Sequence, residues 1–143
     1  FEQKALLDRI TTTQFVADLK GCDLIIEAVY EDRELKGAVT REAEPMLAAG
    51  GFFASNTSTL PISSLAKASN KPQRFVGIHF FSPVDKMALV EVIKGLATCA
   101  ETTQRTIDLA IAMGKTPVPA NDRAGFVSNR VNTRGFTAGC VAR

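Results

Sequence analysis

The chain has 143 residues, 45% of them hydrophobic and 22% charged, with a formal net charge of +2 at pH 7. This composition predicts one soluble globular domain with a packed core and excludes a disordered chain. The basic residues are scattered, so we expect no nucleic-acid partner, and no apolar run approaches the roughly 18 residues of a membrane span. Cys22, Cys99 and Cys140 lack the spacing of a zinc or redox site, which indicates reduced thiols, no metal and a cytoplasmic protein.

The first part of the chain predicts a buried strand between helical segments. Residues 2–10 have a helical pattern, and residues 15–22 indicate a short helical turn. Residues 23–29 form a near-continuous apolar run, which is typical of a strand buried on both faces. Pro45 must kink the next helix or lie where its hydrogen-bond ladder tolerates a proline. The apolar face of that helix is predicted from a spacing of three to four residues: Leu35, Val39, Ala43, Met46 and Leu47.

Three further strands are predicted around one short helix. Residues 50–57 read as a strand, and residues 61–69 as a helix whose first helical residue is Pro61. Residues 74–81 and 88–95 read as two more strands. The loop between these last two is too short for a crossover helix, so we expect them to be antiparallel neighbours.

The last elements complete the expected architecture. Residues 102–113 predict a helix, and residues 115–122 an extended segment that Pro117 and Pro119 place at a sheet edge. Strands alternating with helices predict an α/β fold, a Rossmann-like doubly wound sheet that is parallel at first and has an antiparallel portion after His79.

Polar residues follow three of the predicted strands. Glu31 comes after the first strand, residues 56–58 after the second, and His79 lies near the end of the third. In doubly wound sheets, ligands bind at the carboxyl ends of the strands. The sequence therefore indicates a site at this edge of the sheet.

His79 is the only histidine, and Glu91 lies on the neighbouring predicted strand. A neutral imidazole exchanges a proton near neutral pH, and a carboxylate on its other nitrogen orients it. The alternative is that His79 is a satisfied core histidine and Glu91 is the end of a strand near water, and spacing alone favours this alternative slightly. Either way, a carboxylate among apolar neighbours requires a partner.

The other polar candidates also have two interpretations. Residues 56–58 can hold a substrate oxygen or, more commonly, close a turn, and no G-x-S-x-G motif surrounds Ser58. Asn129 is open to a capping or a ligand role. Glu31 and Lys36 can equally be an ordinary solvated start of a helix.

Four stretches resemble the L-3-hydroxyacyl-CoA dehydrogenase family of fatty-acid β-oxidation: "CDLIIEAVYED", "ASNTSTLPISSLA", "FVGIHFFSPVDKMALVEVI" and "KTPVPANDRAGFVSNRV". They stand in the family's order over about residues 20–132. The "HFFSPVDKM" form is more similar to the dehydrogenase part of multifunctional enzymes, which fuse it to an enoyl-CoA hydratase, than to the stand-alone enzymes.

The resemblance implies hydride transfer from C3 of a 3-hydroxyacyl-CoA to NAD, and a protein that forms a homodimer or associates with a thiolase subunit. It implies that His79 is the general acid/base, that Glu91 orients it, and that Ser58 and Asn129 hydrogen-bond the reacting oxygen. It also implies five residues against the cofactor: Ala28, Glu31, Lys36, Ser58 and Ser82.

The chain also departs from the family's pattern. The G-x-G-x-x-G turn of the first βαβ unit is absent from the 143 residues, since Gly50 and Gly51 precede a strand instead of following one. Ser82 stands where stand-alone enzymes commonly have Asn. We therefore expect a fragment of a longer protein, itself inactive, in which residues 1–124 are the C-terminal portion of the NAD-binding domain. Residues 125–143 would begin a C-terminal helical domain, the rest of which would be absent.

Two alternatives stay open beside this interpretation. One is a related NAD-dependent dehydrogenase that acts on a free hydroxy acid, against which the "HFFSPVDKM" loop argues. The other is a non-catalytic nucleotide-binding or assembly module that has kept a dehydrogenase sheet.

Overall fold

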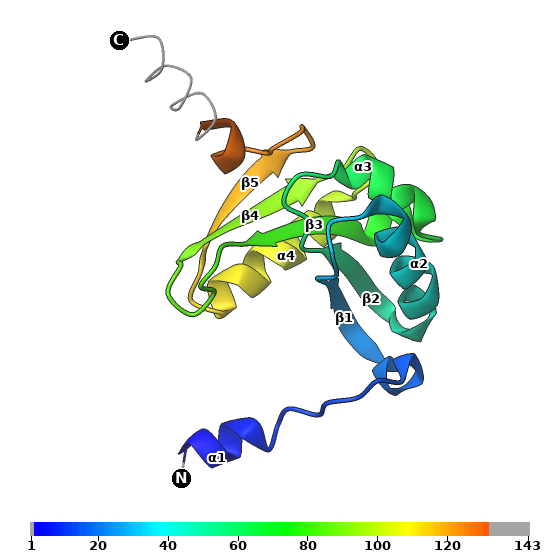
Figure 1. The fold of residues 1–143 in the computed structure, drawn as a ribbon, viewed down its shortest axis with the longest axis vertical. Helices are drawn as coiled ribbons and strands as arrows, with labels where there is room; N and C mark the ends of the chain where they lie inside the picture. The colour runs from blue at the N-terminus through cyan, green and yellow to red at the C-terminus, as the bar shows by residue number, and fades with distance from the viewer. Residues whose placement is uncertain (1, 132–143) are drawn as a thin grey trace.

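The structure of the chain is a computed structural model, and it describes residues 2–131. The strands are β1 (Cys22–Glu27), β2 (Leu47–Ser55), β3 (Phe75–Phe80), β4 (Leu89–Lys94) and β5 (Thr116–Asn121). The helices are α1 (Glu2–Leu7), α2 (Arg33–Ala43), α3 (Ile62–Leu65) and α4 (Ala100–Ala112). Short 3-10 helices are η1 (Val16–Leu19), η2 (Glu44–Met46), η3 (Ala66–Ala68) and η4 (Pro72–Arg74). Figure 1 shows one sheet with α2, α3 and α4 around it, and α1 apart from it at the end of an extended segment.

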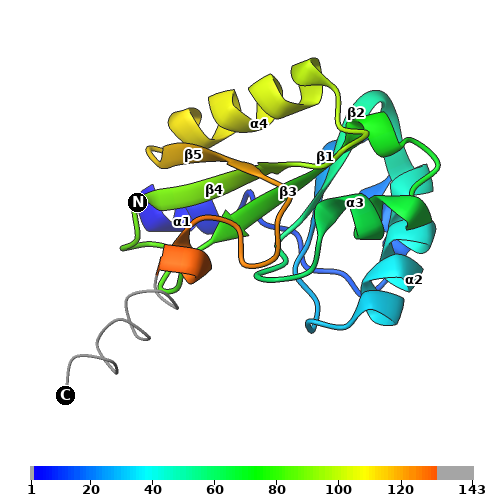
Figure 2. The same ribbon diagram turned by 90° about the horizontal axis from the view of Figure 1, so that it is seen from above.

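The five strands form a single mixed sheet in the order β1-β2-β3-β4-β5. β1, β2 and β3 are parallel to one another, β4 is antiparallel to β3, and β5 is parallel to β4. The helices cover both faces, with α2 and α3 on one side and α4 on the other (Figure 2). The predicted Rossmann-like α/β fold, with an antiparallel portion after His79, is confirmed.

Alternating strand residues build a core on each face of the sheet. Phe53 and Phe75 stack with ring centroids 5.5 Å apart on the α3 side, where Ile62 is fully buried. Val76 and Val92 face the α4 side. The alternation follows from the period of two in strands, so neighbouring residues of β3 point to opposite layers.

The second helix differs from its prediction in its buried face and in its end. α2 ends at Ala43, Pro45 lies in η2, and Leu47 already begins β2. Leu35 is 42% exposed, whereas Lys36 is 1% exposed. The predicted apolar face is therefore wrong at Leu35, because the helix turns Lys36 inward toward a buried carboxylate, whereas Ala43 is buried and Met46 and Leu47 pack against the core. A proline without an N–H then ends the α-helical ladder instead of kinking it.

No helix within residues 2–131 is long and apolar enough to cross a membrane. Of the predicted C-terminal domain, only residues 125–131 are described, and residues 128–131 are helical. Cys140 and the remainder of that predicted domain lie outside the described residues.

Candidate active site

The antiparallel pairing of β3 with β4 places His79 directly opposite Glu91. The two side chains meet with 2.8 Å between His79 Nδ1 and Glu91 Oε2. His79 is 6% exposed and Glu91 is fully buried. A buried carboxylate on Nδ1 selects the tautomer with its proton there, which leaves Nε2 as the nitrogen that can exchange a proton.

Glu91 accepts hydrogen bonds at both carboxylate oxygens. Oε1 accepts from the backbone N–H groups of Val127 and Ser128, each at 2.9 Å. Oε2 accepts from His79 and from the Ser128 hydroxyl at 3.1 Å. Burial raises the pKa of Glu91, but the bonds from His79, Ser128 and Val127 outweigh it, so the pKa lies below its usual value. The sequence analysis missed Ser128, whose partner lies 37 residues away.

Aromatic rings surround the imidazole. The Phe81 ring centroid lies 4.6 Å from that of His79, and the Phe126 centroid lies 6.1 Å away. Phe126 is 2% exposed and has a positive φ of 46°, which marks the tight turn that brings Val127 back to Glu91. These rings restrict the motion of the imidazole and reduce its contact with water.

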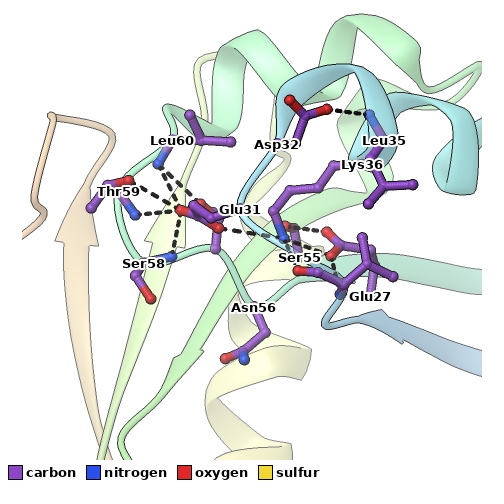
Figure 3. A network of polar contacts seen from close by, with 12 residues as sticks. Glu27, Glu31, Asp32, Leu35, Lys36, Ser55, Asn56, Ser58, Thr59 and Leu60 are labelled. Atoms are coloured by element: carbon purple, nitrogen blue, oxygen red, sulfur yellow. Dashed lines mark hydrogen bonds and ion pairs between the residues drawn. The ribbon is translucent and has the colours of Figure 1, made fainter.

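Glu31 holds the turn that follows β2, as Figure 3 shows. Its Oε1 accepts from the Thr57 hydroxyl at 2.5 Å and from the backbone N–H groups of Ser58 at 3.0 Å and Thr59 at 2.9 Å. Burial raises the pKa of Glu31, but these bonds and the charge of Lys36 lower it to about 2. Glu31 is therefore a stable anion that fixes the backbone of the turn carrying Ser58.

A buried ion pair lies beside this turn (Figure 3). Lys36 Nζ is 2.6 Å from Glu27 Oε1, and both side chains are 1% exposed. The Ser55 hydroxyl donates to the other Glu27 oxygen at 2.7 Å. Lys36 Nζ also lies 3.5 Å from Glu31 Oε2. Lys36 thus supports Glu31 from inside the fold, and its predicted contact with a cofactor stays a prediction.

Sequence reasoning did not single out Glu27. It lies inside the apolar run that predicts β1, and its side chain points into the α2 side of the sheet. Lys36 is the matching signal, because a lysine at a buried helix position requires a counter-charge nearby. Nine residues separate the two partners.

Asn129 and Asn56 join the loops around this edge. Asn129 Nδ2 donates to the backbone carbonyl of Ser58 at 3.0 Å, so these two predicted site residues lie together. Asn56 Oδ1 accepts from the Phe80 N–H at 2.9 Å, which ties the end of β2 to the end of β3. Within residues 2–131, the Ser58 hydroxyl makes no protein hydrogen bond.

A third carboxylate organises the start of α3. Asp122, directly after β5, accepts from the backbone N–H groups of Ile62 and Ser63, both at 2.7 Å. Sixty residues separate Asp122 from Ile62, so the sequence offered no local signal for this cap.

The remaining predicted cofactor positions are exposed at the same edge. Ala28 follows β1 and Ser82 follows β3 by two residues, and both are exposed. Together with Glu31 and the Ser58 hydroxyl, they offer small and polar groups at the carboxyl ends of the parallel strands, and their contact with a cofactor stays a prediction. Within residues 2–131, no three His, Cys, Asp or Glu side chains are grouped as metal ligands.

Two curated proteins are similar to the chain over most of its length. A probable 3-hydroxybutyryl-CoA dehydrogenase of Deinococcus radiodurans is 42% identical over 128 residues, which cover 90% of the chain and 46% of that protein. A fatty acid oxidation complex subunit alpha of Shewanella halifaxensis is 44% identical over 126 residues, which cover 88% of the chain and 18% of that protein. The chain thus spans less than half the length of both relatives.

A solved structure and a family profile agree with these relatives. The (S)-3-hydroxybutyryl-CoA dehydrogenase of Ralstonia eutropha superposes with a TM-score of 0.88 at 37% identity, over 92% of the chain and 46% of that structure. This confirms the resemblance that the motifs indicated. Residues 2–123 match the family described as "3-hydroxyacyl-CoA dehydrogenase, NAD binding domain", and the chain belongs to that family.

Proposed function

We propose that the protein containing this chain oxidises L-3-hydroxyacyl-CoA to 3-ketoacyl-CoA with NAD, and that His79 is its general acid/base. The observation that carries the proposal is the buried contact of 2.8 Å between His79 and Glu91 at the carboxyl edge of the sheet. The family and the 3-hydroxybutyryl-CoA dehydrogenase name of a relative support this substrate class.

The proposed mechanism assigns the proton to His79. When bound, NAD supplies the hydride acceptor. His79 Nε2 takes the proton of the substrate hydroxyl, and Glu91 stabilises the imidazolium through Nδ1–H. In the reduction direction, the protonated His79 returns the proton to the carbonyl oxygen. General acid/base catalysis of this kind contributes about 10²–10⁴-fold.

The flanking residues complete the proposed site. Ser58 and Asn129 hydrogen-bond the reacting oxygen, and their mutual contact of 3.0 Å supports a shared location. Glu31 keeps the Ser58 turn in place. The residues proposed to lie against NAD are Ala28, Glu31, Lys36, Ser58 and Ser82.

The assembly of the protein belongs to the same proposal. One relative is named as a subunit of a fatty acid oxidation complex, which supports a partner subunit. We propose that this partner is a thiolase, that the protein is a cytoplasmic homodimer, and that residues 1–143 alone turn over little substrate.

Replacing His79 with Gln in the full-length protein tests the proposal. The variant should lose about 10²–10⁴-fold in kcat, because Gln keeps a polar side chain but cannot exchange the proton. The affinity for NAD, measured by titration calorimetry, should stay within about twofold, since the imidazole acts on the substrate. A variant that oxidises 3-hydroxybutyryl-CoA at the unchanged rate would refute the assignment of His79.

A further inference from the structure

The two oxygens of the Glu91 carboxylate accept hydrogen bonds from different kinds of donor. Oε1 accepts two backbone N–H groups, which belong to Val127 and Ser128. Oε2 accepts two side-chain groups, the imidazole of His79 and the hydroxyl of Ser128. The backbone pair sets the orientation of the carboxylate, and the hydroxyl acts on the oxygen that His79 uses.

We propose that Ser128 is a positioning residue for the acid/base pair: its hydroxyl shares Glu91 Oε2 with His79 and limits how strongly the carboxylate holds the protonated imidazole. This inference rests on the proposed function. It assigns to the chain a residue that controls the pH range of the reaction without touching the substrate.

Sharing one oxygen between two donors has a defined electrostatic effect. A hydrogen bond to a carboxylate stabilises its negative charge and so makes the carboxylate less basic. The hydroxyl at 3.1 Å therefore weakens the attraction of Oε2 for the imidazolium at 2.8 Å. Because Glu91 is fully buried, solvent screens this competition only weakly.

Few other charges lie close enough to mask the effect. α3 carries no titratable residue, and β5 places Val118 opposite Glu91. Asp122 binds the start of α3 instead. On the Glu91 side of the sheet, the charged or titratable groups are His79 on β3, and Asp122, Arg123 and Arg130 after β5. α4 packs on the opposite face and carries Glu101, Arg105 and Asp108, and Lys94 ends β4. Of these, within residues 2–131, His79 alone contacts the Glu91 carboxylate.

The effect should appear on one side of the pH profile. Oxidation needs the neutral imidazole of His79. A stronger attraction of Glu91 for the imidazolium therefore shifts the rise in activity to higher pH. In Ser128→Ala, the acid limb of kcat/KM for 3-hydroxybutyryl-CoA oxidation should move upward by about half a pH unit. The rate on the acid side should fall about threefold, while the alkaline plateau stays within about twofold of wild type.

Conservative and matched variants separate this role from packing. Ser128→Thr keeps the hydroxyl, so the acid limb of its kcat/KM profile should stay at the wild-type pH. Ser128→Cys offers a weaker donor and should give an intermediate shift, which also provides a readout if the alanine variant does not fold. Ser64→Ala removes a hydroxyl that makes no hydrogen bond within residues 2–131 and should match wild type.

The outcomes distinguish this inference from the proposed function. If His79→Gln is inactive but the pH profile of Ser128→Ala is unshifted, only the role of Ser128 is overturned. A uniform loss of rate at all pH values in Ser128→Ala, with the limb in place, also overturns it. A fully active His79→Gln variant overturns the proposed function itself.

Discussion

Lys36 is a charged residue that the fold turns into its interior. Its amino group bonds Glu27 at 2.6 Å and the Val29 carbonyl at 3.0 Å, and its side chain is 1% exposed. Glu27 in turn accepts from Ser55 and from the Val29 N–H at 2.8 Å. The network connects the ends of β1 and β2 with α2, beside the turn that carries the proposed substrate contact Ser58.

Replacing Lys36 with Met should destabilise the protein strongly. Met has a similar length but no charge, so the buried Glu27 carboxylate would lose its counter-ion, which costs about 3–5 kcal/mol in the free energy of unfolding. Urea denaturation of the purified protein measures this loss. The matched control is Lys67→Met, because Lys67 is exposed, and its effect should stay within about 0.5 kcal/mol.

A second substitution shows whether the cost comes from the isolated charge. Glu27→Gln combined with Lys36→Met should be less destabilised than Lys36→Met alone, since the uncompensated anion is gone. If Lys36→Met were as stable as wild type, the pair would have no structural role.

At the scale of elements, three carboxylates bind the backbone of segments that surround the sheet. Glu31 after β1 binds the backbone of the turn after β2. Asp122 after β5 binds the start of α3. Glu91 on β4 binds the segment after residue 126. Each loop is therefore fixed by a different element, and the site depends on all five strands being in place.

The contact of α3 with the sheet depends on Gly77 in β3. A Cβ built at Gly77 would lie 2.7 Å from Ile62 Cδ1 and 2.9 Å from Ile93 Cβ. Gly77→Ala should therefore push α3 away from β3 and cost about 1–3 kcal/mol in the free energy of unfolding. Thermal unfolding followed by circular dichroism measures the change.

Gly50 provides the matched control for this overpacking. No heavy atom lies within 4 Å of a Cβ built at Gly50. Gly50→Ala should leave the melting temperature close to that of wild type. If Gly77→Ala had the same melting temperature as Gly50→Ala, α3 would not be packed against β3 as described.

At the scale of the whole molecule, Glu31 makes stability depend on pH. Its pKa is lowered from 4.5 to about 2 in the folded protein, so the folded state binds a proton less readily than the unfolded state. The stabilisation is complete above the unfolded pKa of 4.5 and is lost as the pH falls toward about 2. Its size is on the order of 1–2 kcal/mol, because the side chain is 33% exposed and solvent screens it.

Glu31→Gln removes this pH dependence. Wild type should exceed the variant in unfolding free energy at pH 7, and the difference should shrink between pH 4.5 and about 2. Urea titrations at several pH values measure the difference. Glu42→Gln, an exposed residue of α2, should follow wild type throughout. A difference that stays constant with pH would contradict the role of the Glu31 charge.

Much of the fold could be predicted because a strand has a recognisable pattern in its own short stretch of sequence. The apolar runs around Ile25 and before His79 predict β1 and β3, and the short loop after His79 predicts an antiparallel neighbour. The contact of His79 with Glu91 follows from that register. Ser128 and Asp122 could not be predicted, because their bonds join segments 37 and 60 residues apart.

The inward turn of α2 was missed for a different reason. Apolar spacing places Leu35 inside, but the ion pair of Lys36 with Glu27 outweighs the burial of one leucine. A prediction from hydrophobic periodicity considers only apolar residues and therefore ignores a buried ion pair.

The two edges of the sheet differ in what they can accept. β5 pairs with β4 along all six of its residues, and Pro117 and Pro119 occupy alternate positions in it. The backbone nitrogens of these two prolines face the side of β5 that is turned away from β4. Because prolines lack N–H groups, this side cannot donate hydrogen bonds to a further strand, which blocks its addition there. β1 contains no proline and, within residues 2–131, has no strand on its outer side. The sheet can therefore grow in one direction only, and any added strand, from the same polypeptide or another, must join beside β1.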